Sequence, residues 1–348
     1  MKNFCEIFKE VRTNQKWWNY YKLKSDQIQS DSDTMDSDKF IKNFIEVSGK
    51  AEISLYKAIE GLKYTIRPDH IVNTFFLGVY LYNNSRSIKK QINKATDVFR
   101  TVLSDHDEQD RFQFIWFLIC LFHDLGYNVE LESNSLKSKE RKQRIIEIEQ
   151  EIEKLIKIRK IHGVPPLYEN IITKYLKYRN TVFRCIDHGI YAGIRLFWDL
   201  CENRSIKEFS PSKLSYKFGL IEVYHYAACI ILAHNIFFAK QGSFEDEPYK
   251  IHDLDSLIFE PNKYRISLDK HPMFFLFCLV DTIEPIKVFK EDGELLKNIF
   301  LSYSDNNLTI RSEIKCGCHD TYFSKVKSLN DWVTPVKELD SQTLEIQL

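Results

Sequence analysis

The stretch that decides the fold is FQFIWFLICLFHDLG, residues 112–126. Its apolar run, residues 114–122, is typical of a buried helix. The run ends at His123-Asp124, and the glycine at position 126 would permit a break in the helix directly afterwards. We therefore expect an imidazole and a carboxylate side by side at a buried helix end, where both can turn toward one centre.

Candidate metal ligands recur on both sides of this pair, each on or against an apolar segment of helical character. Pro68 suits the first turn of a helix and places His70 near the start of that helix. A single histidine on an apolar face is more often a hydrogen-bonded core residue than a ligand. Several buried and unpaired polar groups, however, would each cost about 1–3 kcal/mol, and a shared metal site removes that cost. The other candidates, with the buried helices expected around them, are His188 (187–200), His234 (224–240) and Asp281 (271–289, interrupted at Pro285).

The composition excludes several classes of protein. The 348 residues include 49 basic and 49 acidic side chains, so no net charge is available to attract nucleic acid or an anionic membrane. Residues 1–11 lack the pattern of a signal peptide, and no uninterrupted apolar stretch approaches the length needed to cross a bilayer. The eight cysteines are scattered, and we expect them to be reduced. These features favour a soluble, cytoplasmic protein without a membrane partner.

We predict a mainly α protein with a small mixed α/β appendage at its C-terminal end. Residues 1–36 are expected to form an N-terminal aromatic extension and a polar linker. Residues 37–300 are expected to form the helical, metal-binding domain. Residues 301–348 are expected to form the appendage, in which a turn at residues 305–307 before an alternating apolar pattern indicates a β-hairpin.

A charged helical insertion, residues 138–163, lies within the helical domain. Its Ile145, Ile148, Ile152 and Leu155 form one apolar stripe at helical spacing. We interpret the segment as a solvated helix that rests one face on the body of the protein. The alternatives are a contact between two copies of the chain, which would make a homo-oligomer, and a lid over the site.

Other histidines and cysteines carry weaker signals. Residues 316–319 (CGCH) lack the second ligand pair of a zinc site, and we interpret them as a turn. His225 lies nine residues before His234, about two and a half helical turns, so we expect it to support a ligand from behind or to pack in the core rather than to share metal ligation. His162 lies beside a polar or proline-marked break and is expected at the surface.

The ordered set of candidate ligands resembles the signature of the HD-domain metal-dependent phosphohydrolase superfamily. Two local sequences add to the resemblance, DHGIYAG at residues 187–193 and VDTIEP at residues 280–285. Together the matching positions span roughly residues 66–290. The connection that contains the charged insertion is longer than the compact family core requires. The matching residues, in order, are His70, His123-Asp124, His188, His234 and Asp281.

The resemblance implies an HD-type helical bundle with two divalent metal ions, bridged by Asp124. It assigns one ion to His70, His123, Asp124 and Asp281, and the other to Asp124, His188 and His234. These ligands suit Mn, Fe, Zn, Mg, Co or Ni and do not distinguish among them. Two such ions lower the pKa of a bridging water and hold a phosphoryl oxygen. We therefore predict a phosphohydrolase that cleaves a phosphoester or phosphoanhydride with a metal-activated water. Its substrate, by family resemblance, is a small phosphorylated molecule such as a nucleotide.

Two alternatives keep the same ligands and change the function. HD-type diiron oxygenases use such a site to activate dioxygen, and a non-catalytic protein could use it as a metal-stabilised sensor or scaffold. For the hydrolase we assign catalytic roles to His123, Asp124 and Lys287, the last as a clamp for phosphate, because it follows Asp281 by six residues. The other basic candidates near ligand-bearing segments are Arg184, Arg195 and Lys240.

Overall fold

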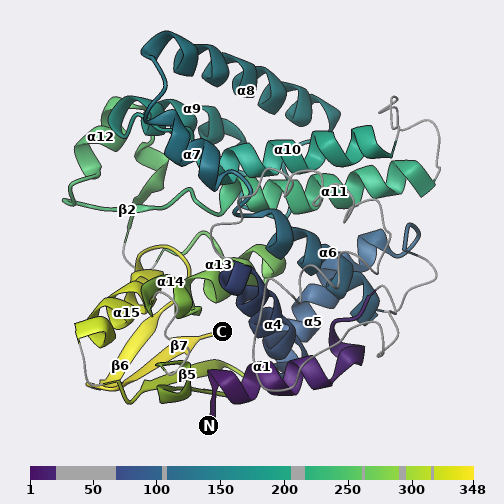
Figure 1. Ribbon diagram of the computed structural model, residues 1–348, viewed down its shortest axis with the longest axis vertical. Coiled ribbons are helices and arrows are strands. Elements are labelled where there is room, and N and C mark those ends of the chain that lie inside the picture. The colour runs from purple at the N-terminus through teal and green to yellow at the C-terminus, as the bar shows by residue number, and fades with distance from the viewer. Residues whose placement is uncertain (21–67, 104–107, 205–215, 261–262, 290–294, 315–316) are drawn as a thin grey trace.

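The fold is that of a computed structural model, which describes residues 1–20, 68–103, 108–204, 216–260, 263–289, 295–314 and 317–348. It is mainly helical with a small region of strands toward the C-terminal end, as predicted from the sequence. The predicted boundary at residues 36–37 lies outside the described residues. Figure 1 shows strands β5, β6 and β7 at one end of the molecule, with most of the helices above and beside them.

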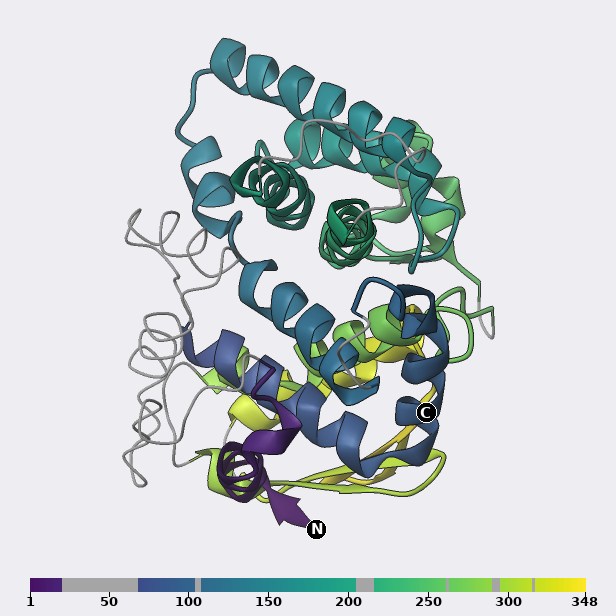
Figure 2. The same cartoon turned by 90° about the vertical axis from the view of Figure 1, so that its right-hand side faces the viewer.

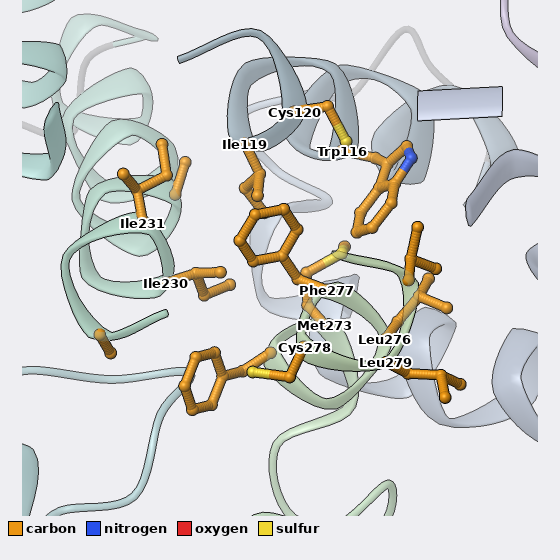
Figure 3. Packing of buried hydrophobic residues seen from close by; sticks show 14 of the residues in the cluster. Trp116, Ile119, Cys120, Ile230, Ile231, Met273, Leu276, Phe277, Cys278 and Leu279 are labelled. Carbon is orange, nitrogen blue, oxygen red and sulfur yellow. The ribbon is translucent and has the colours of Figure 1, made fainter. Parts of the chain in front are cut away.

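Helices that pack apolar side chains against one another form the centre of the molecule. They are α4 (Pro68–Asn84), α5 (Arg86–Thr96), α6 (Glu108–Phe122), α11 (Tyr216–Ala233) and α13 (Pro272–Ile283). Phe277 of α13 lies between Trp116 and Ile119 of α6 and Ile230 and Ile231 of α11 (Figure 3). All five side chains are buried, and burial of each contributes roughly 1.5–3 kcal/mol. This packing fixes α6, α11 and α13, each of which ends near a candidate ligand.

Helix α10 (His188–Asn203) packs along α11, and the close approach depends on Gly193. A Cβ atom at Gly193 would lie 2.7 Å from the carbonyl oxygen of Ala228, too close for any side chain. The sequence prediction that small residues let this helix approach its neighbour is therefore confirmed. Outside the pair lie α7 (Tyr127–Ser133), α8 (Ser138–Ile158) and α9 (Tyr168–Val182) (Figure 1).

Helix α8 corresponds to the charged insertion. Its Ile145, Ile148, Ile152 and Leu155 are buried against the body of the protein, so the predicted apolar stripe is confirmed. Contacts with α9 and α10 cover this stripe, while the charged side chains of the helix face away from it.

The two ends of the chain share one antiparallel sheet, with the strand order β1-β4-β5-β7-β6. The predicted hairpin is present, because β4 pairs with β5 and Tyr303 lies opposite Leu308 across the turn. Strand β1 pairs with β4, and α1 (Phe4–Thr13) then packs on α4, so the first residues lie on the central helices (Figure 2). The strands are β1 (Lys2–Asn3), β4 (Ile299–Tyr303), β5 (Asn307–Ser312), β6 (Val336–Asp340) and β7 (Thr343–Gln347).

The helix predicted over residues 224–240 is too long at its C-terminal end. Helix α11 stops at Ala233, and residues 239–240 form β2, which pairs with β3 (Ile258–Phe259). The reason is tertiary. Tyrosine hydroxyls donate hydrogen bonds to three successive carbonyls of the extended segment, from Tyr175 to residue 235, from Tyr168 to residue 236 and from Tyr249, on α12 (Asp246–Ile251), to residue 237.

The turn predicted at residues 316–319 is also wrong. Residue 317 begins helix α15 (Gly317–Lys327). One face of this helix is buried and consists of Tyr322, Phe323 and Val326. Packing of these three side chains stabilises a helix that the Cys-Gly-Cys-His pattern does not suggest. The short helix α14 (Ile286–Phe289) lies against it, beyond the predicted break at Pro285.

One described segment, Asp110–Ser133, is long and apolar enough to cross a bilayer by length and composition. This differs from the expectation that no stretch approaches that length. About 61% of its most apolar window is buried inside the protein, and a turn divides it into α6 and α7. It therefore has the packing of a core helix, and a soluble protein is consistent with it.

Candidate metal centre

The six residues predicted to bind metal lie together where five helices meet. His70 is in the first turn of α4, His123-Asp124 is in the turn after α6, and His188 is the first residue of α10. His234 directly follows α11, and Asp281 is near the end of α13. They form two triads, each with ligand atoms within 4.8 Å of one another: His70, His123 and Asp281, and Asp124, His188 and His234.

The first triad is tightly gathered around the imidazole of His70. The Nε2 atom of His70 lies 3.0 Å from Oδ1 of Asp281 and 3.2 Å from Nε2 of His123. The Nε2 atom of His123 lies 3.8 Å from the same Asp281 oxygen. Three atoms with lone pairs thus face one small volume.

Asp124 lies between the two triads. Its Oδ1 atom is 3.4 Å from Nε2 of His123 and 3.7 Å from Nε2 of His188, and its Oδ2 atom is 4.0 Å from Nε2 of His70. One carboxylate therefore reaches histidines of both groups. This is the position that the sequence assigned to a bridging ligand.

The four histidines share a hydrogen-bond arrangement that suits a metal. Each Nδ1 atom faces an oxygen acceptor, so Nδ1 can hold the ring proton while the lone pair of Nε2 binds a metal. Such an arrangement fixes the ring and leaves Nε2 to bind a cation, which is the usual pattern for histidines that ligate metals. The acceptors are Glu284 for His70 at 2.8 Å, the carbonyl of Cys120 for His123 at 2.8 Å, Glu130 for His188 at 2.5 Å and the carbonyl of Ile231 for His234 at 2.5 Å.

Glu284 is a buried anion that orients His70. Burial would raise the pKa of its carboxyl, but the hydrogen bond and charge of His70, the charge of Lys325 and the backbone N–H of Ile286 outweigh burial and lower it. Its second oxygen accepts from Asn73 at 3.1 Å and from Ile286 at 3.0 Å. Glu284 lies within the VDTIEP sequence, but its role as a partner of His70 was not predicted from the sequence.

Glu130 has the same role for His188, and the sequence analysis missed it. Burial would raise the pKa of Glu130, but His188 and Arg179 lower it overall. Burial would likewise lower the pKa of His188, yet Glu130, Asp187 and Asp124 raise it. Arg179 also lies 3.4 Å from Asp187, whose carboxylate caps α10 by accepting from the N–H of Ile190. No local sequence pattern marks Glu130, because it is 58 residues from His188.

His234 stays neutral. Burial and the neighbouring imidazoles of His188 and His123 lower its pKa to about 4. A neutral imidazole is the form that binds a metal.

Gly126 is required for packing rather than for an unusual backbone. The break predicted at this point is present, but the φ of Gly126 is −81°, which is open to any residue, so the break does not need the conformational freedom of glycine. A Cβ atom there would lie 2.3 Å from the carbonyl oxygen of His188. Glycine therefore lets the turn that carries Asp124 contact the first residue of α10.

The carboxylates mark the accessible side of the centre. The side chains of His70 and His123 are fully buried, whereas 11% of Asp124 and 20% of Asp281 are exposed. Lys325 donates from Nζ to the backbone carbonyl oxygen of Asp281 at 3.1 Å, and its charge acts on the buried carboxylate of Glu284.

The predicted phosphate clamps are placed less favourably. Arg184 and Lys240 are exposed, and Arg195 forms an ion pair with Asp199 on its own helix. Lys287 lies in α14, but its side chain is outside the described part of the chain, so its role stays a prediction. Lys325, near the end of α15, was missed because more than 40 residues separate it from Asp281.

Comparison of the chain with protein-family models, with curated proteins and with solved structures found no match. The chemistry of the site therefore rests on its own geometry. Four imidazoles with lone pairs directed inward and two carboxylates, one of them central, could hold metal ions.

Proposed function

We propose that the protein is a cytoplasmic, metal-dependent phosphohydrolase that cleaves a phosphoester or phosphoanhydride, with a nucleotide as the substrate. The observation that carries the proposal is the central position of Asp124, within 4.0 Å of histidines from both triads. The order of the ligands along the chain, which resembles that of HD-domain phosphohydrolases, supports the choice of reaction. Because no comparison found a relative, the reaction and the substrate are proposals.

Each part of the site has a distinct task in this proposal. One metal ion would be held by His70, His123 and Asp281, a second by His188 and His234, with Asp124 between them. When bound, two divalent ions supply a water of lowered pKa and positive charge for a phosphoryl group.

The protein supplies orientation and a direction of access. Glu284 and Glu130 hold two imidazole rings in place and carry negative charge that increases the basicity of these ligands. The partial exposure of Asp124 and Asp281 indicates the side from which substrate enters. Lys325, whose Nζ donates to the backbone carbonyl oxygen of Asp281, adds positive charge beside the centre.

The test combines metal analysis with a hydrolysis screen. Purified protein is analysed for bound metal and assayed against cyclic, mono- and polyphosphate nucleotides. The variant His123→Ala/Asp124→Ala is expected to lose metal and hydrolysis together, while the control His252→Ala, outside both triads, keeps them. Full hydrolysis by the double variant would contradict the proposal. Oxygen consumption by an iron-loaded protein that hydrolyses none of the nucleotides would identify the oxygenase alternative instead.

A further inference from the structure

A second cluster of side chains that could bind a metal lies along α11, before the C-terminal end that precedes His234. His162, His225 and Cys229 offer ligand atoms within 4.8 Å of one another. His225 and Cys229 are four residues apart and share one face of α11, and His162 comes from the segment after α8. Nine residues separate His225 from His234, roughly 13 Å along a helix, so the cluster is distinct from the centre described above.

Burial of this cluster differs from the sequence predictions. His225 and Cys229 are fully buried, as expected for core residues, and His162 is partly buried rather than exposed at the surface. Its ring stacks on that of His225 with centroids 5.1 Å apart, and the Nε2 atom of His162 is buried with no hydrogen-bond partner among the described residues. Gly163 holds this segment against α11, because its φ is +80° and a Cβ would lie 2.3 Å from the ring of Tyr226.

Two of the three distances between the ligand atoms are close to those of a tetrahedral site, and the third pair lies within 4.8 Å. The Nδ1 atom of His225 lies 3.2 Å from Nδ1 of His162 and 3.4 Å from Sγ of Cys229. With Zn–N distances near 2.0–2.1 Å and a Zn–S distance near 2.3 Å, tetrahedral angles separate the ligand atoms by about 3.3–3.6 Å. The cluster therefore needs little rearrangement to surround an ion.

Hydrogen bonds alone do not account well for this arrangement. The Nε2 atom of His225 faces the carbonyl of Leu155 at 3.4 Å, which places the ring proton on Nε2. Its Nδ1 atom then has one lone pair, and both the ring of His162 and the thiol of Cys229 lie within reach of it. Only one of these donors can use that lone pair, whereas a cation would use a lone pair from each of the three residues.

We propose that His162, His225 and Cys229 form a second metal site, for zinc, which pins the segment after α8 to α11. Imidazole and thiolate ligands suit this borderline-soft cation, and three protein ligands leave a fourth position for water. Zinc binding would use a lone pair of each imidazole and would release the thiol proton of Cys229 to solvent.

Cobalt substitution tests this site separately from the six-ligand centre. Co²⁺ bound to a thiolate gives a sulfur-to-metal charge-transfer band in the near ultraviolet, and the six-ligand centre contains no cysteine. The full chain loaded with Co²⁺ is expected to show the band, and Cys229→Ser to lose it together with one equivalent of bound metal. The control Cys201→Ser removes a buried thiol of α10 outside the cluster and should keep both.

Further variants make the result decisive. His162→Ala replaces a half-buried residue at the edge of the cluster and serves as the test variant if Cys229→Ser does not fold. It is expected to weaken the band. His123→Ala/Asp124→Ala should keep the band while losing metal from the other centre. Hydrogen exchange is expected to speed up at the C-terminal end of α8 when zinc is removed. Absence of the band in folded, cobalt-loaded wild-type protein, or its persistence in Cys229→Ser, would overturn the proposal.

Discussion

At the scale of single residues, the four histidines of the centre are oriented in two physically different ways. His123 and His234 each donate to the carbonyl three residues earlier, Cys120 and Ile231, at the end of a helix. Carbonyls in the last turn of a helix have no intrahelical donor, so these acceptors are available locally. His70 and His188 instead donate to carboxylates from distant parts of the chain. The second arrangement adds charge and makes the imidazole a stronger ligand.

Replacement of Glu284 tests this difference. Glu284→Gln keeps the shape of the side chain but removes the charge that orients His70, so metal affinity is expected to fall about 10–100-fold. Isothermal titration with Mn²⁺ measures the affinity, and circular dichroism checks the fold. Glu338→Gln, on exposed β6, is the control and should leave the affinity unchanged. Equal affinity in the two variants would mean that Glu284 does not support the site.

Gly126 provides a steric test of the turn that carries Asp124. Gly126→Ala places a methyl group 2.3 Å from a backbone oxygen that cannot move aside easily, so we expect a loss of about 1–3 kcal/mol in unfolding free energy and weaker metal binding. Gly317→Ala is a matched control, because nothing lies within 4 Å of its Cβ. Urea unfolding of both variants measures the difference. A Gly126→Ala protein as stable as Gly317→Ala would show that the turn relaxes without cost.

At the scale of helices, α13 carries Asp281 and begins at a histidine that is unfavourable to protonate. Burial and the charge of Lys270 lower the pKa of His271 to about 4, although Asp269 opposes the shift. His271 is the N-cap of α13, where the helix dipole also disfavours a positive charge. The acid stability of this helix therefore depends on one imidazole.

The sign of the pH effect follows from linkage. The unfolded chain protonates His271 near pH 6.5 and the folded chain near pH 4, so its contribution is complete above pH 6.5 and is lost as the pH falls toward 4. The side chain of His271→Asn cannot be protonated. As the pH falls through this range, the ratio of the variant's folding equilibrium constant to that of the wild type should rise by at most tenfold per pH unit. Urea unfolding at pH 7 and pH 5 measures the gain. Parallel pH profiles for the two proteins would contradict the prediction.

The helices show what the sequence could and could not predict. The starts of α4 and α10 were predictable because Pro68 and Asp187 act locally, and Asp187 does accept from the third N–H of its helix. The end of α11 could not be predicted from local sequence, because hydroxyls of three distant tyrosines stabilise the extended segment that follows. Likewise, six candidate ligands could be chosen by type and apolar context, but Glu130 and Glu284 are recognisable only once the chain folds.

At the scale of the whole molecule, the centre joins helices that are far apart in sequence. Residues from position 70 to position 281 meet there, and the sheet formed by both chain ends lies against the same central helices (Figure 2). Metal ions bound at this point would hold together elements that the chain connects only through long segments. Folding and metal binding should therefore be coupled.

Chelation tests that coupling. A ligand present at 100 times its dissociation constant stabilises the folded state by about 2.7 kcal/mol, so removal of metal with EDTA should lower the thermal unfolding midpoint by several degrees. The variant His123→Ala/Asp124→Ala, which lacks two of the six ligands, should start from a lower midpoint and lose less on chelation. Cys229→Ser, measured in parallel, separates the contribution of the proposed zinc site, because it leaves all six ligands in place. If metal analysis shows loaded wild-type protein and EDTA removes that metal without moving the midpoint, the centre does not hold the helices together.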